Sequence, residues 1–181
     1  MTIIGLWLPI LVSAVFVFIA SAAVWMVMPW HKSDFNKTAD EDAVRAALKG
    51  SAAGFYMLPY CVNPKDLEDP EIKQKYVDGP QAYITVVANG LPQMGSKMLL
   101  SFLYYMVVGV ICAYFVSRTA SADADYLAVF RIAGAVAWVA YGVAYIQDSI
   151  WFGRPWSMTV KNLFDALIYA VLTGGVFGWL V

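Results

Sequence analysis

The 181-residue chain is too apolar for an ordinary soluble domain: 61% of its residues are hydrophobic and only 14% are charged, whereas soluble domains carry roughly 25% charged residues. Its formal net charge of −1 offers no basic surface that would attract nucleic acid, which excludes that class of partner. The apolar residues are gathered into runs long enough to cross a bilayer, so the sequence predicts an integral membrane protein in contact with lipid.

Residues 1–30 contain the first predicted membrane-spanning helix. The stretch Ile3 to Met28 carries no charged residue, and it exceeds the ~20 apolar residues that cross a bilayer as a helix. A cleaved signal peptide would begin with Lys or Arg and would have a shorter apolar region. We therefore expect this stretch to remain in the protein as its first span.

Residues 31–97 change to charged and turn-forming residues and predict a small mixed α/β segment outside the membrane. Thr38 and Glu41 have the spacing of a capping box, which predicts a helix running to about Lys49. The other elements expected here are a second short helix and two short strands that could pair: a helix starting at Asp69 and Pro70 and ending near Val77, and strands at Phe55–Tyr60 and Ala82–Val87.

Residues 98–181 contain three more apolar runs. They predict spanning helices over residues 98–116, 126–146 and 161–181. Aromatic and charged residues are mixed in Gln147–Val160, as is typical of an interfacial segment. The expected fold is an all-α membrane protein, a four-transmembrane-helix bundle with the mixed segment between helices 1 and 2.

Rows of small residues mark helix faces suited to close packing. The residues in these rows are spaced four apart: Ala166, Ala170, Gly174 and Gly178 in the last span, and Gly109 and Ala113 in the second. Residues four apart share one face of a helix, and small side chains allow two backbones to approach closely. We expect another helix to pack on each of these faces.

Polar and charged residues gather at one membrane interface, because consecutive spans alternate in direction. The cluster expected there is His31, Asp34, Asp148, Arg154, Lys161, Asn162 and Asp165. Asp165 lies about one turn inside the last span, where an ionisable residue suggests a functional role. Lys161, four residues earlier, is its nearest expected cation. The alternative that we favour is structural: Asp165, satisfied by Lys161, Arg154 or water, would fix the fourth helix against the third.

His31 is the only histidine, which excludes a site built from several histidines, such as a bis-histidine haem. With Asp34 three residues later it could act as a general base or a lone ligand, or it could be a solvated residue beside the membrane. The sequence contains none of the motifs GxSxG, GxxxxGK(S/T), HExxH or CxxC. We therefore expect no metal, no cofactor and no catalytic residue.

Lys and Arg near the span ends set the expected orientation, because short cytoplasmic loops are enriched in them. Six lie on the side of the long segment: Lys32, Lys37, Arg45, Lys97, Arg154 and Lys161. Two lie on the side of the termini, Arg118 and Arg131, and Arg131 is about one turn inside its span, where its stem can extend to the headgroups. We expect residues 31–97 to be cytoplasmic and both termini to be outside.

Two parts of the chain resemble a known group of proteins. They are HKSDF (His31–Phe35) with DEDAV (Asp40–Val44), and GRPW (Gly153–Trp156) with NLFDALIYA (Asn162–Ala170). These phrases are similar to those of small four-span bacterial membrane proteins, a group without an assigned activity. The resemblance spans most of the chain and implies a bacterial inner-membrane location, but it carries over no catalytic residue.

Three functions remain as hypotheses. Many packing faces and few catalytic groups favour a non-enzymatic structural or accessory module, in a homo-oligomer or a larger membrane complex. The alternative is a small proton-linked or small-molecule transporter in which Asp165 titrates while Asp148, Asn162 and Tyr169 line the path. A weaker alternative is a membrane-embedded enzyme on lipid-like substrates that uses the sole histidine and Asp34.

Overall fold

The computed structural model describes residues 2–121 and 123–181. It is mostly helical, and it contains four helices long and apolar enough to cross a membrane: Ile4–Met26, Met94–Thr119, Tyr126–Phe152 and Trp156–Leu180. The predicted four-span bundle with a small mixed segment after the first span is therefore confirmed. The chain divides into two compact units, the bundle (residues up to Asn36 together with Gln93–Val181) and an outer unit (Lys37–Pro92).

The first span begins with a short 3₁₀ turn, η1 (Ile4–Leu6), and continues as α1 (Trp7–Met26). Its buried side chains recur at helical spacing and form one face: Ile10, Ser13, Ala14, Val17, Ser21 and Val24. Pro29 has no backbone N–H to continue the helix. The chain turns there into a second 3₁₀ segment, η2 (Trp30–Asp34).

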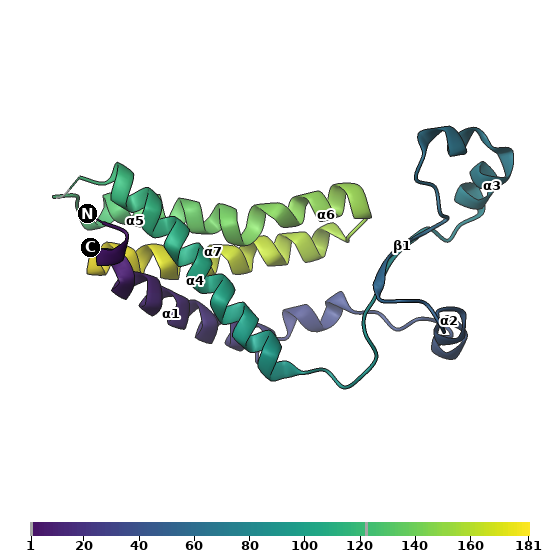
Figure 1. Cartoon of the computed structure of the whole chain (residues 1–181), viewed down its shortest axis with the longest axis horizontal. Coiled ribbons are helices and arrows are strands. Elements are labelled where there is room, and N and C mark those ends of the chain that lie inside the picture. The colour runs from purple at the N-terminus through teal and green to yellow at the C-terminus, as the bar shows by residue number, and fades with distance from the viewer. Residues whose placement is uncertain (1, 122) are drawn as a thin grey trace. The chain divides into compact units, whose positions relative to one another are not determined.

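The second span is α4 (Met94–Thr119), which starts four residues before the predicted residue 98. The third consists of α5 (Tyr126–Trp138), a π-helical turn η4 (Val139–Val143) and α6 (Ala144–Phe152). The fourth is α7 (Trp156–Leu180). Figure 1 shows α5 and α6 lying along α7, which also contacts α1, while α4 contacts both α1 and α5. The four spans thus close into a ring of helix contacts.

The segment between the third and fourth spans is shorter than predicted. Most of Gln147–Val160, expected to be interfacial, is helical, and only Gly153–Pro155 connects α6 to α7. Gly153 has a φ of 62°, the left-handed conformation that often ends a helix and that glycine adopts without strain. The aromatic and charged residues of this segment are compatible with a helix. Their presence is typical of a membrane interface, but it does not show where the helices end.

The row of small residues on α7 packs against α5 of the same chain. A Cβ atom added at Gly174 would lie 2.8 Å from the carbonyl oxygen of Phe130, and one added at Gly178 would lie 2.9 Å from that of Tyr126. Ala166 and Ala170 are buried on the same row. The predicted packing face is therefore occupied within one chain, and it does not by itself indicate a second copy.

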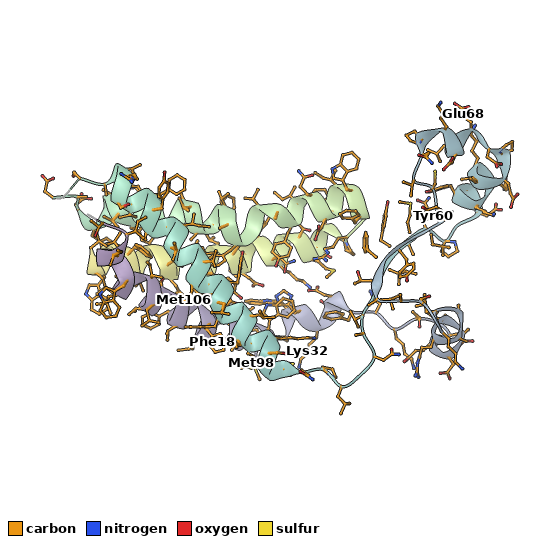
Figure 2. The ribbon with its side chains drawn as sticks, viewed as in Figure 1. Phe18, Lys32, Tyr60, Glu68, Met98 and Met106 are labelled. Atoms are coloured by element: carbon orange, nitrogen blue, oxygen red, sulfur yellow. The ribbon has the colours of Figure 1, made fainter. Side chains whose placement is uncertain are left out.

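The second small face joins α4 to α1. A Cβ atom added at Gly109 would lie 3.2 Å from the Ile10 side chain and 3.3 Å from its carbonyl oxygen, and Ala113 is fully buried nearby. Figure 2 shows apolar side chains such as Phe18 and Met106 along these two helices. Both small-residue faces thus close the bundle on itself.

The outer unit contains α2 (Glu41–Ala47), β1 (Gly54–Leu58), η3 (Pro64–Glu68), α3 (Pro70–Asp78) and β2 (Ala82–Val86). The two strands pair antiparallel, with Gly54 opposite Val86 and Leu58 opposite Ala82. The expected Thr38 capping box is wrong, because the Asp40 side chain accepts the hydrogen bond from the amide of Ala43 instead. The helix therefore begins at Glu41 and ends at Ala47, before the predicted Lys49.

Candidate functional site: an Asp34–His31–Asp165 bridge

The η2 turn brings a histidine and a carboxylate together. Residues three apart lie on the same side of a 3₁₀ helix, which is the spacing of His31 and Asp34. The Nδ1 atom of His31 lies 2.7 Å from Oδ2 of Asp34. The turn that Pro29 forces at the end of the first span thus assembles half of the site.

The other half of the site comes from α7. The Nε2 atom of His31 lies 2.7 Å from Oδ2 of Asp165, a residue 134 positions later in the chain. Both residues are only 3% exposed. The imidazole therefore bridges two carboxylates inside the protein, and the alternative of a solvated residue beside the membrane is wrong for His31.

Two tryptophans cover the bridge. The indole of Trp25, near the end of α1, stacks on the His31 ring with centroids 4.0 Å apart and planes 4° from parallel. Trp30 approaches the same ring edge-on, at 6.3 Å between centroids. Stacking on Trp25 holds the imidazole plane in one orientation, with its two nitrogens directed at the two carboxylates.

Lys161 fastens η2 to α7. Its Nζ atom donates hydrogen bonds to the backbone oxygen of Trp30 at 2.7 Å, to Oγ of Ser33 at 2.8 Å and to Oδ1 of Asp34 at 2.5 Å. Lys161 was predicted to be the nearest cation of Asp165, and this is wrong: it pairs with Asp34, and His31 takes its place beside Asp165. We refer to His31, Asp34, Lys161 and Asp165 as the bridge cluster.

Charge balance in the bridge cluster depends on one proton. Burial raises the pKa of Asp34, but the hydrogen bonds and charges of Lys161 and His31 outweigh this effect and hold the pKa below its ordinary value of 3.8. Asp34 is therefore ionised at neutral pH. With Lys161 and His31 both protonated and Asp165 ionised, two positive charges match two negative ones.

The positions of the two carboxylates around His31 also limit how many protons the bridge must carry. A neutral imidazole has one N–H, and an ionised carboxylate only accepts hydrogen bonds. Because both ring nitrogens of His31 face carboxylate oxygens at 2.7 Å, two bonds form only when the ring is an imidazolium or when one carboxylate carries the proton. Removing that proton leaves a nitrogen lone pair facing a carboxylate oxygen. Both hydrogen bonds of the bridge therefore form only when this additional proton is bound.

Several buried polar atoms continue from the bridge into the bundle. Within the described residues, Oδ1 of Asp165, Nε1 of Trp30 and the hydroxyl of Tyr169 are buried without a hydrogen-bond partner. Tyr169 lies one turn further along α7, on the predicted polar face that also holds Asn162 and Thr173, all of them buried. The polar face of α7 thus points into the protein and not toward lipid.

A group of tyrosines surrounds the inner end of this polar face. The ring of Tyr169 lies 5.8 Å from that of Tyr141 and 6.5 Å from that of Tyr105. The hydroxyl of Tyr104 donates to the carbonyl oxygen of Ala140 at 2.8 Å, within the π-helical turn η4. π-Helical turns are rare and often occur at functional sites.

The predicted seven-residue cluster separates into two groups. His31, Asp34, Lys161 and Asp165 come together, and Asn162 is buried on the same face of α7. Asp148 and Arg154 form their own pair at 3.5 Å, and both side chains are more than one-third exposed. Trp25, Trp30 and Ser33 were not predicted as part of the site, although two tryptophans shortly before a lone histidine at the end of a span were a usable signal.

In the described part of the chain, no three His, Cys, Asp or Glu side chains are arranged to hold a metal ion. Cys61 and Cys112 are both free thiols.

Comparisons of the chain with protein-family models, with curated proteins and with solved structures found no match.

Proposed function

We propose that this integral membrane protein is a small proton-linked transporter, in which the bridge cluster binds and releases the transported proton. One observation carries the proposal: His31 joins two buried carboxylates from distant parts of the chain in a geometry that requires a bound proton. An ionisable group inside a membrane protein is costly, and it is typically found on a proton or substrate pathway. Here His31, Asp34 and Asp165 share one proton in addition to the N–H of the neutral imidazole.

The bridge is asymmetric, which indicates where it opens. Asp34 keeps Lys161 as a partner whatever the state of His31, whereas the second oxygen of Asp165 has no hydrogen bond within 3.5 Å among the described residues, with the indole of Trp30 as a nearby donor. Loss of the proton leaves the ring with one N–H, so one of its two carboxylate contacts loses its hydrogen bond, while the contact between Asp34 and Lys161 remains. When the remaining N–H is on Nδ1, the lost bond is the one to Asp165, and η2 is then held to α7 through Lys161 alone.

Tyr169 is the next polar group inward. It lies one turn from Asp165, its hydroxyl is buried, and Tyr105 and Tyr141 lie beside it. The nearby π-helical turn of the third span contains Gly142, where an added Cβ atom would be 2.8 Å from Cβ of Ala166. We assign Tyr169 as the first group to exchange a proton with Asp165, along a path between α7 and the third span.

The test is proton flux in proteoliposomes that contain a pH-sensitive dye. Na⁺, K⁺ and Cl⁻ are present on both sides, so proton conduction and proton–ion exchange are both detected after a pH step. Asp165→Asn keeps the shape of the side chain but removes its titration, and we expect flux to fall at least about tenfold. Asp148→Asn is the control, because Asp148, expected from the sequence to line the path, is a partly exposed acid that pairs with Arg154 outside the bridge cluster.

Two outcomes would reject this function. One is wild-type flux no faster than that of empty liposomes. The other is unchanged flux in Asp165→Asn, with the variant shown to be folded by gel filtration and circular dichroism. Equal losses in Asp165→Asn and Asp148→Asn would assign the effect to surface charge and not to the bridge.

A structural or accessory role keeps one specific observation in its favour. Within the outer unit, residues 37–92, only Pro59 is buried, while Tyr60, Val77 and Leu91 are largely exposed. A unit with so small a core is suited to bind another protein. Crosslinking in native membranes tests this role: a specific larger species supports it, and a clean monomer contradicts it.

We also propose a membrane and an orientation. The resemblance to small bacterial four-span proteins supports the inner membrane, and the excess of Lys and Arg beside the outer unit supports a cytoplasmic location for residues 31–97. The bridge cluster then lies near the cytoplasmic interface. Labelling of single cysteines introduced at exposed positions of the outer unit checks the orientation, and labelling from the outside would reverse it.

A further inference from the structure

A groove of about 240 Å³ runs between α5 and α7 on the outside of the bundle. Its floor is made of Gly134 and Ala170, whose backbones lie so close that a Cβ atom added at Gly134 would be 3.6 Å from the carbonyl oxygen of Ala170. Phe130, Trp138 and Leu167 form its walls. Large side chains beside a small-residue contact thus leave a narrow apolar channel on the bundle surface.

The groove faces the bilayer. Trp138 and Leu167 are 39% and 48% exposed in the isolated chain, and both lie well inside their spans. Leu167 points away from the polar face of α7, because it is two residues, about 200° of helix rotation, from Asp165. The groove is therefore separate from the bridge cluster, and the molecules that reach it are those of the lipid phase.

One end of the groove carries a positive charge. Arg131 is among the lining residues, five residues after the start of α5 and so about 7.5 Å along the helix. No carboxylate in the described part of the chain forms an ion pair with it. An arginine at this depth reaches toward the phosphate level and is stabilised by an anionic partner there.

We propose that this groove is a binding site for an anionic phospholipid, with one acyl chain in the apolar channel and the headgroup phosphate on Arg131. Charge and shape both favour this occupant, since an arginine guanidinium forms strong charge-assisted hydrogen bonds with phosphate and the apolar channel beside it suits an acyl chain. The bound chain would lie against α5 and α7 together. The inference is independent of the proposed transport function.

The experiment is native mass spectrometry of the purified full-length chain with added phosphatidylglycerol or phosphatidylcholine. Arg131→Gln should weaken phosphatidylglycerol binding about fivefold and phosphatidylcholine binding less, because the choline cation offsets the charge of the phosphate that both lipids carry. Arg118→Gln is the matched control, because Arg118 lies near the same membrane face but over the Tyr114 ring, outside the groove. Equal losses in the two arginine variants would overturn the proposal, as general surface charge would then explain the binding.

A second variant tests the channel without touching the charge. Ala135 lines the groove from an exposed position, so Ala135→Trp fills the channel from the lipid side and should reduce the binding of both lipids. Leu127→Trp, at an exposed position on the same helix outside the groove, is its control. Unchanged lipid binding in Ala135→Trp would also overturn the proposal.

Discussion

Replacement of Gly174 by alanine should destabilise the bundle through a single added methyl group. That Cβ atom would lie 2.8 Å from the carbonyl oxygen of Phe130 and 3.1 Å from Cα of Gly134, both backbone atoms of α5. Backbone cannot move aside as a side chain end can, so α5 and α7 must separate. Overpacking of this kind typically costs about 1–3 kcal/mol.

The adjacent residue provides a control with the same chemistry. A Cβ atom at Gly175 would meet only the Tyr126 hydroxyl at 3.7 Å, an ordinary contact. Gly175→Ala should therefore be neutral or stabilise the protein by about 0.4–1 kcal/mol through the lower entropy of the unfolded chain. Thermal or denaturant unfolding of both variants in the same detergent measures the difference. Equal stabilities would mean that the small-residue face of α7 does not hold the bundle together.

Two further predictions concern the bridge cluster. Because His31 is the only histidine, ¹⁵N-histidine labelling gives one pair of imidazole NMR signals. We expect Asp165→Asn to change the chemical shift of Nε2 more than that of Nδ1. Equal changes would contradict the separate pairing of the two nitrogens. The lowered pKa of Asp34 means that its stabilising contribution is present above its unfolded pKa, near 3.8, and is lost as pH falls through the lower folded pKa. Lys161→Met removes one cause of that lowering, so the folded and unfolded pKa values of Asp34 come closer together and less stability is lost in acid, as acid titration of the melting temperature would show; an unchanged acid transition would contradict the pairing of Lys161 with Asp34.

The spans could be predicted from sequence because bilayer thickness alone requires long apolar runs. Their ends could not, because helices continue past the apolar core into the interface. The turn at Gly153–Pro155 is set by the left-handed conformation of one glycine, inside a segment whose composition suited an interface. The Thr38 capping box failed for a similar local reason, since Asp40 competes for the same role two residues later.

Counting the spans was enough to predict that the residues of the bridge cluster lie at the same membrane interface. It did not predict which of these residues pair with one another. Lys161 is four residues from Asp165, and helix spacing favours that pair. The pairing is decided instead by the direction in which η2 leaves the first span after Pro29, which carries His31 to Asp165 and Asp34 to Lys161. A contact between residues 134 positions apart depends on packing that no local pattern contains.

Helix α7 makes two contacts of different character on opposite faces, because Asp165 and Gly174 are nine residues, about 180° of helix rotation, apart. Against α5 it meets backbone at Gly174 and the ring and backbone of Tyr126 at Gly178, a contact too close for an added methyl group and without any buried carboxylate or imidazole. Against η2 it meets His31 through Asp165, a contact that requires a proton. Any movement driven by protonation should therefore displace η2 and the end of α1 relative to a fixed pair of α5 and α7. Distances between spin labels across the two contacts would separate these motions: a pH-dependent change between α5 and α7, with none between η2 and α7, would refute this assignment.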